Sequence, residues 1–246
     1  KYDEFRFLRE KKAEGKAKRI GFSYHGDAAL LDKILTGHPE VDVVLMQLNY
    51  LDWEREGIQS RKCYETCLRH GKSVMVMEPV KGGTLAKLPD DAEAKLRLRH
   101  PDWTPSDWAL RFVQSLPGVE ICLSGMGAVE QVQSNIQPFE PLTGEETALL
   151  AEVAEIIRGK TAIGCTGCGY CVNHCPKQIP IPKYIKLYNE ITRYPGDDWK
   201  IIPTYHQMAL SAGKASDCIG CHSCEKHCPQ KLTISEHMKT IAKAFE

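Results

Sequence analysis

Residues 165–181 read CTGCGYCVNHCPKQIPI, and residues 218–234 read CIGCHSCEKHCPQKLTI. The two copies lie 53 residues apart and agree at eight of 17 positions, which include all four cysteines, the glycine before the second cysteine and the His-Cys-Pro end. In each copy three closely spaced cysteines form one tight loop, and a proline turns the chain away after the fourth. The repeat predicts that residues 161–246 fold around two metal centres.

The spacing C-x-x-C-x-x-C-x-x-x-C-P is typical of bacterial two-cluster ferredoxins, in which the fourth cysteine of each copy ligates the other copy's 4Fe-4S cluster. The expected ligands of the first cluster are Cys165, Cys168, Cys171 and Cys228. The expected ligands of the second cluster are Cys218, Cys221, Cys224 and Cys175. Zinc is a weaker alternative, because a zinc site would need only pairs of C-x-x-C. Disulfides are weaker still, because they would force clashes at this spacing.

The composition is that of a folded protein. Of the 246 residues 42% are apolar and 26% charged, so enough apolar surface exists to bury a core. Lys and Arg equal Asp and Glu at 32 each, which argues against the basic field of a nucleic-acid-binding protein. The longest apolar run, around residues 43–46, is far shorter than the ~20 residues of a membrane span. No secretory signal opens the sequence, and eleven cysteines without one favour metal binding in the cytoplasm.

Residues 1–160 alternate between segments of helical pattern and short apolar runs. The apolar runs predict four strands, at 20–23, 41–48, 74–77 and 119–123. Strands that alternate with helices form parallel β/α units. Because a closed eight-stranded barrel needs about 250 residues, this part predicts either a small open sheet or half of a barrel. Residues 161–246 lack the alternation and predict helices near 183–191, 204–212 and 235–245.

Four strings in residues 1–160 carry a resemblance to a known family. They are IGFSYHG at 20–26, QLNYLD at 47–52, MEPVKGG at 77–83, and LSGM at 123–126 with EQVQSN at 130–135. In order and spacing they resemble strands five to eight of the aldo/keto reductase barrel. Together with the cysteine repeat, they make the whole chain resemble the iron–sulfur branch of that family.

The resemblance implies an α/β fold: the second half of a TIM (β/α)₈ barrel, strands five to eight, followed by an α-helical ferredoxin-like domain with two clusters. The domains would be residues 1–160 and 161–246. Strands one to four, which carry the family's catalytic Asp, Tyr, Lys and His, have no match, so no catalytic residue is assigned. The chain starts with Lys1 rather than Met, and we expect it to be a C-terminal fragment of a longer protein.

The resemblance also implies a cofactor site. Ser23 and Gln47 match positions that hold the nicotinamide carboxamide, and Gly125 and Asn135 lie where the family binds the adenosine end. Gly125 and Gln131 stand where Lys and Arg usually clamp the 2′-phosphate of NADPH. Because this phosphate clamp is missing, a preference for NADPH is not expected, and NADH, a flavin and no nucleotide are open. Ser23 and Gln47 have the alternative role of buried polar residues bonded to a neighbouring strand.

These features predict an iron–sulfur oxidoreductase of aldo/keto reductase type, which passes electrons between a barrel-bound nicotinamide or flavin and two 4Fe-4S clusters. A hydride carries two electrons and a cluster takes one, so a flavin is the expected intermediary. The alternative is a non-catalytic, ferredoxin-like electron-transfer module. The expected partners are a redox protein or a small-molecule substrate, not nucleic acid or a membrane. The missing N-terminal half or a second chain is expected to cover the open sheet edges.

Overall fold

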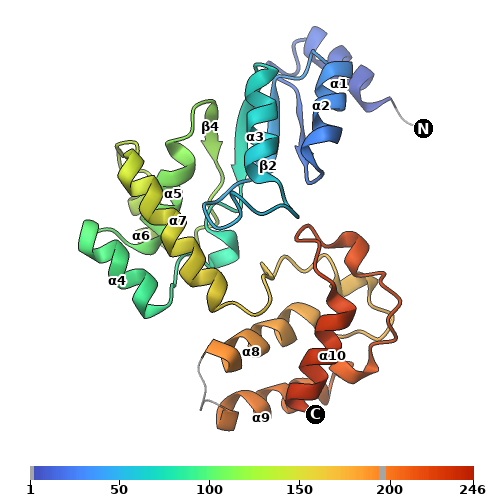
Figure 1. Cartoon of the computed structure of the whole chain (residues 1–246). Helices are drawn as coiled ribbons and strands as arrows, with labels where there is room; N and C mark the ends of the chain where they lie inside the picture. The colour runs from blue at the N-terminus through green and yellow to red at the C-terminus, as the bar shows by residue number, and fades with distance from the viewer. Residues whose placement is uncertain (1–2, 194–197) are drawn as a thin grey trace. The chain divides into compact units, whose positions relative to one another are not determined.

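The computed structural model describes residues 3–193 and 198–246. The chain divides into two compact units, Lys1–Ala154 and Glu155–Glu246 (Figure 1). The division falls inside helix α7 (Gly144–Gly159). The domain boundary that the sequence predicts, between residues 160 and 161, stays a prediction.

The first unit is built on one parallel sheet. Its strands are β1 (Gly21–Tyr24), β2 (Val43–Gln47), β3 (Ser73–Met77) and β4 (Val119–Cys122). They lie side by side in chain order, and each neighbouring pair is parallel. Each strand coincides with a predicted apolar run. Because connections between parallel strands are right-handed, a sheet wound in chain order keeps its crossover helices on one face, as in a (β/α) barrel. The unit therefore has a partial TIM-barrel-like α/β fold.

Seven helices are described in or at the end of this unit. They are α1 (Glu4–Ala13), α2 (Ala28–Gly37), α3 (Ser60–Arg69), α4 (Asp90–Arg99), α5 (Pro105–Gln114), α6 (Val129–Asn135) and α7. Asp27 caps the start of helix α2, because its carboxylate accepts a hydrogen bond from the Leu30 backbone N–H at 2.8 Å. The sequence does not predict α4, because only Ala92 and Leu96 of its ten residues are buried, so no apolar stripe marks it.

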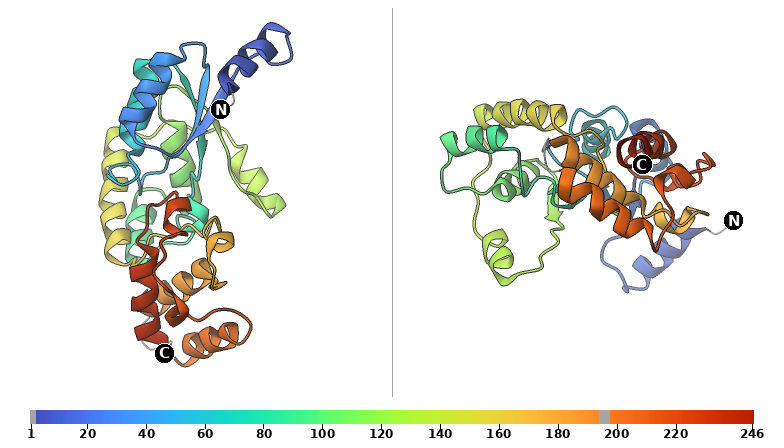
Figure 2. Two further views of the ribbon diagram at one scale, coloured as in Figure 1. Left: turned by 90° about the vertical axis from the view of Figure 1, so that its right-hand side faces the viewer. Right: turned by 90° about the horizontal axis from the view of Figure 1, so that it is seen from below.

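The core of the first unit lies between the sheet and the helices that contact it. Helices α2 and α3 lie on one side of the strands in the left view of Figure 2. Alternate strand residues are almost completely buried, as a period of two requires: Val44, Met46, Val74 and Val76. The residues between them form a second row, in which Leu45 pairs with Met75 and Met75 with Ile121. Ile121 is 45% exposed, so this opposite face carries an apolar row that the described residues cover only in part.

The second unit is helical. Its helices are α8 (Ile181–Arg193), α9 (Asp198–Ala209) and α10 (Ile234–Phe245). They pack around buried aromatic rings, with centroids 4.5 Å apart for Tyr184 and Tyr205 and 4.9 Å apart for Tyr205 and Phe245. The helix predicted at 183–191 lies inside α8. The helix predicted at 235–245 covers all of α10 except its first residue, Ile234. The helix predicted at 204–212 is wrong at its start, because Pro203 lies inside α9 rather than before it.

Candidate functional site

The two cysteine motifs have the same backbone conformation. Positive φ values occur at three pairs of matched positions: Gly167 (74°) and Gly220 (64°), Gly169 (82°) and His222 (56°), and Gln178 (52°) and Lys231 (51°). The last cysteines agree as well, with φ/ψ of −91°/111° at Cys175 and −84°/111° at Cys228. The repeat in the sequence is therefore a repeat in the structure, and glycine suits the left-handed positions of the loops.

The first motif surrounds an open cavity, whose empty volume of about 320 Å³ includes the solvent at its mouth. Its walls carry the three closely spaced cysteines of this motif and the last cysteine of the other: Cys165, Cys168, Cys171 and Cys228. Apolar side chains form most of the remaining wall, among them Ile181, Ile185, Leu232 and Ile234. The cavity is therefore a sulfur-rich space that is closed on its inner side by aliphatic groups.

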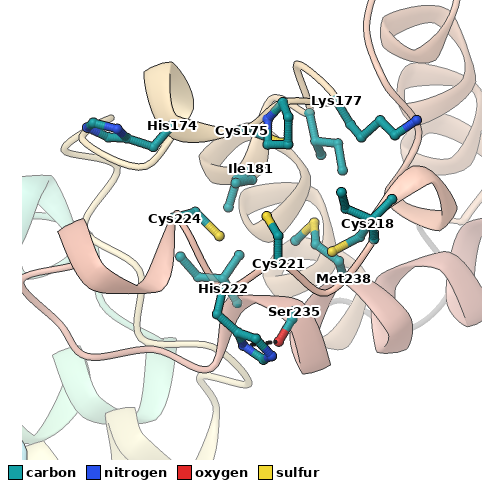
Figure 3. A pocket seen from close by; sticks show the side chains of 14 residues that line it. His174, Cys175, Lys177, Ile181, Cys218, Cys221, His222, Cys224, Ser235 and Met238 are labelled. Carbon is teal, nitrogen blue, oxygen red and sulfur yellow. Dashed lines mark hydrogen bonds between the residues drawn. The ribbon is translucent and has the colours of Figure 1, made fainter.

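The second motif surrounds a matching open cavity, whose empty volume of about 350 Å³ also includes the solvent at its mouth (Figure 3). Here the cysteines are Cys218, Cys221 and Cys224 of the second motif, with Cys175 of the first. The side chains of Cys218, Cys221 and Cys224 point toward one another in Figure 3. Ile179, Ile181, Ile234 and Met238 add apolar wall. Each cavity thus takes three cysteines from one motif and the fourth from the other.

The electrostatics of the buried thiols reflect this exchange. Burial raises the pKa of Cys171 to about 12, and nearby sulfurs, that of Cys228 included, add to the rise. Burial likewise raises the pKa of Cys224 to about 11, with further contributions from Glu225 and Cys175. Thiols in such surroundings ionise when a bound cation compensates their charge.

The donor set fits an iron–sulfur cluster. Within residues 3–193 and 198–246, no three His, Cys, Asp or Glu side chains are gathered closely enough to hold a single metal ion. Instead, four sulfurs surround each cavity, and four cysteine thiolates are the usual ligands of a 4Fe-4S cluster. The residues present therefore suit two such clusters.

Polar groups beside the second cavity form a small network that the first cavity does not repeat. The His222 ring nitrogen Nδ1 lies 2.9 Å from Glu225 Oε2. Ser235 donates its hydroxyl to Glu225 Oε1 at 2.7 Å. The position that matches His222 is Gly169 in the first motif, so the network holds a histidine in a left-handed conformation that glycine adopts freely.

A separate group of polar side chains, in the first unit, lies at the carboxyl ends of β2 and β3. Barrel enzymes place their active sites at such strand ends. Gln47 Nε2 donates to Asp52 Oδ2 at 2.8 Å, and Asn49 Nδ2 donates to the same oxygen at 3.1 Å. The ammonium of Lys81 contacts this oxygen as well, and the side chains of Lys81 and Asp52 are 3% and 1% exposed. Burial opposes the charge of Asp52, but the charge of Lys81 and the hydrogen bonds outweigh it and lower the pKa of the carboxyl group.

Sequence reasoning missed the contact between Asp52 and Lys81. The residues that follow β3 form a 3₁₀ turn, η1 (Lys81–Gly83), in which Lys81 is buried. The signal that points to the contact is positional. An acid and a base each follow the end of one of two adjacent parallel strands, and such ends meet at one edge of the sheet.

The predicted cofactor residues lie in different surroundings. Ser23 is exposed, Gln47 is buried in the Asp52 network, Gly125 is exposed and Asn135 is half-buried. Asn135 Nδ2 donates to Ser124 Oγ at 3.1 Å, which holds α6 against the loop that carries Gly125. The structure therefore brings the two adenosine-side positions together. Their role in binding a nucleotide, like that of Ser23 and Gln47, stays a prediction.

Gln131 has a structural role at the start of α6. Its Oε1 accepts hydrogen bonds from the backbone N–H groups of Gly127 (2.7 Å) and Ala128 (3.3 Å). These two donors lie just before the first residue of α6, Val129, and without Gln131 they could meet an anion there. Gln131, which is predicted to stand in the place of a phosphate-clamping side chain, thus caps the start of the helix.

None of the helices in the described parts of the chain has the length and apolar character needed to cross a membrane.

The aldo/keto reductase family model matches residues 2–155, and the 4Fe-4S dicluster domain model matches residues 164–234. No curated protein matches the chain significantly.

Fourteen chains of solved structures match. One is the aldo-keto reductase AKR11C1 from Bacillus halodurans (apo form), at 23% identity and a TM-score of 0.48 over 61% of this chain and 55% of that chain. Another is Gox0644 in its apo form, at 20% identity and a TM-score of 0.49 over 61% of this chain and 51% of that chain. The chain therefore spans about half the length of these two structures.

Proposed function

Because the chain belongs to the aldo/keto reductase family and carries a 4Fe-4S dicluster domain, we propose that it is part of an iron–sulfur oxidoreductase. In this proposal electrons pass between a nicotinamide or flavin at the strand ends of the first unit and two clusters in the second. The observation that carries the proposal is the pair of cavities, each lined by three cysteines of one motif and the last cysteine of the other.

The proposed ligands follow from the cavity walls. Three cysteines of the first motif with Cys228 would hold one cluster, and three of the second motif with Cys175 would hold the other. When bound, such clusters supply one-electron transfer. Ile181 and Ile234 line both cavities and would exclude water from the inner side of each cluster, which tunes its electrostatics.

We propose further that β1 to β4 correspond to strands five to eight of a barrel and that the second unit is a ferredoxin-type helical domain. Two features of the sheet support the first part: the strands follow one another in chain order, and β1 and β4 are its two edges. The partly exposed row that includes Ile121 supports it as well. Strands from elsewhere in the protein or from a second chain would pair with these edges and cover this row.

For the nucleotide, we propose a site at the carboxyl ends of the strands, with Ser23 and Gln47 on the nicotinamide side and Gly125 and Asn135 on the adenosine side. Asp52 would orient the Gln47 amide, because it already accepts a hydrogen bond from Gln47 Nε2.

A second candidate is a non-catalytic electron-transfer module. Two observations favour it: the amide of Gln47 already donates to Asp52, and the helix start that would meet a phosphate is capped by Gln131. Both groups are therefore satisfied without a nucleotide.

One preparation tests both candidates. Protein purified without oxygen is expected to contain about eight iron and eight sulfide per chain. Titration of the same sample with NADH, NADPH and FMN then distinguishes the candidates: stoichiometric binding that Ser23→Ala weakens supports the enzyme, and no binding supports the module. Zinc without acid-labile sulfide would contradict both.

A further inference from the structure

The histidines that precede the last cysteine of each motif are in contact with each other. His174 and His227 occupy equivalent positions of the repeat. Their rings are stacked, with centroids 3.4 Å apart and planes 7° from parallel. Both residues are exposed, so burial alone does not force the rings together.

Contact between equivalent residues has a geometric meaning. A residue meets its own counterpart where a local two-fold axis relates the two copies, as in an isologous interface. The stack therefore marks the point at which the two binding loops cross. His174 ends the 3₁₀ turn η2 (Val172–His174), and His227 ends the equivalent turn η4 (Glu225–His227).

The cysteines that follow lie just beyond this crossing. Cys175 lines the cavity of the second motif, and Cys228 lines the cavity of the first. His174 itself lines the second cavity, beside Cys175. A shift of one loop at the crossing would therefore move both of the exchanged cysteines.

We propose that the stacked rings of His174 and His227 are a positioning pair, which holds the two loops at their crossing so that Cys175 and Cys228 each reach the other motif's cavity. The proposal rests on the proposed binding of clusters in these cavities. It assigns the role to the flat ring surfaces, because an aromatic stack is held by ring overlap. It also couples the two cavities, because the loss of one ring would leave both exchanged cysteines without this support.

The test compares His174→Ala, His227→Ala and the double variant. Each oxygen-free protein is mixed with an excess of a ferrous-iron chelator, and the release of iron is followed by absorbance. Loss of the stack is expected to speed the release of iron by about two- to tenfold. All of the iron should be released at this faster rate. The double variant should match the single variants, because either substitution already removes the stack.

The paired substitutions His174→Phe and His227→Phe keep the ring overlap and should restore the wild-type rate. His206→Ala is the matched control, since His206 is an exposed histidine on α9, outside both motifs. Far-UV circular dichroism verifies that each variant is folded.

The outcomes separate this proposal from the one on which it rests. Wild-type protein without iron would overturn the cluster assignment, and the positioning role with it. Wild-type protein with about eight iron and alanine variants that release it at the wild-type rate would overturn the positioning role alone. So would single effects that add in the double variant, acceleration limited to half of the iron, or phenylalanine variants that behave like alanine.

Discussion

Lys81 and Asp52 form a buried ion pair that ties the loop after β3 to the loop after β2. Their side chains are 3% and 1% exposed, and Gln47 and Asn49 donate to the same carboxylate. A charge in the interior depends on its partner, because removal of one member leaves the other without compensation. The pair therefore fixes the edge of the sheet at which the proposed nucleotide site lies.

Substitution Lys81→Met is expected to lower the free energy of unfolding of the first unit by about 3 kcal/mol, because it leaves the Asp52 carboxylate buried without the ammonium. Adding Asp52→Asn should recover part of this loss. Urea unfolding is followed by tryptophan fluorescence in a Trp199→Phe background, so that the signal comes from the first unit. Lys95→Met is the control, since the pair of Lys95 with Glu152 is 45% and 62% exposed and should contribute less than about 1 kcal/mol. Equal effects of both substitutions would contradict the assignment.

Glu146 should make the first unit sensitive to acid. Its carboxylate lies 2.6 Å from His100 Nε2 and accepts a hydrogen bond from the Thr143 backbone N–H at 2.8 Å. Burial alone would raise its pKa, but these partners prevail and lower it from 4.5 to about 2. Because the folded pKa is the lower one, the stabilisation is complete above about pH 4.5 and is lost as the pH falls toward 2.

Glu146→Gln is therefore expected to cost about 1–2 kcal/mol at neutral pH and to flatten the loss of stability between about pH 4.5 and 2. Unfolding free energies in the same fluorescence assay measure both effects. Glu145→Gln, at the exposed neighbouring position, should change neither. If the unfolding free energy of Glu146→Gln fell with acid as steeply as that of the wild type, this carboxylate would not carry the pH dependence.

Gly213 should be required for the second cavity. A Cβ atom at this position would lie 2.1 Å from the Lys177 carbonyl oxygen and 3.2 Å from the Ile179 side chain, and both residues line that cavity. Gly213→Ala is expected to displace this segment and to reduce the iron content toward four atoms per chain, the number in one cluster. Gly159→Ala is the control, because a Cβ there meets nothing within 4 Å. Full iron content in Gly213→Ala would refute the proposed displacement.

The sequence predicts the strands of the first unit because their apolar runs are short, Val-rich and separated by helical segments. It places the second strand at 41–48, whereas β2 spans Val43–Gln47, a difference confined to the ends. It does not predict α4, because charged residues cover most of that helix and burial of Ala92 and Leu96 depends on tertiary packing. It misplaces the start of α9, because proline usually precedes a helix rather than lying within it.

The candidate site, too, can be predicted from the sequence only in part. The spacing of the cysteines is enough to predict how they are grouped around the two cavities, because each loop is local in sequence and only the last cysteine crosses. Their ligation of iron stays a prediction. The pair of Lys81 and Asp52, 29 residues apart, and the stack of His174 on His227 depend on how separate loops meet, which no local pattern records.

The crossed arrangement of the cysteines is tested most directly by the iron content of two double variants. Cys175→Ser with Cys218→Ser removes two ligands of one proposed cluster, whereas Cys175→Ser with Cys165→Ser removes one ligand from each. With crossed ligation, the first variant is expected to retain about four iron atoms per chain and the second almost none. The opposite pattern, with iron retained only by the variant that lacks Cys175 and Cys165, would show that each motif binds its own cluster and would contradict the account.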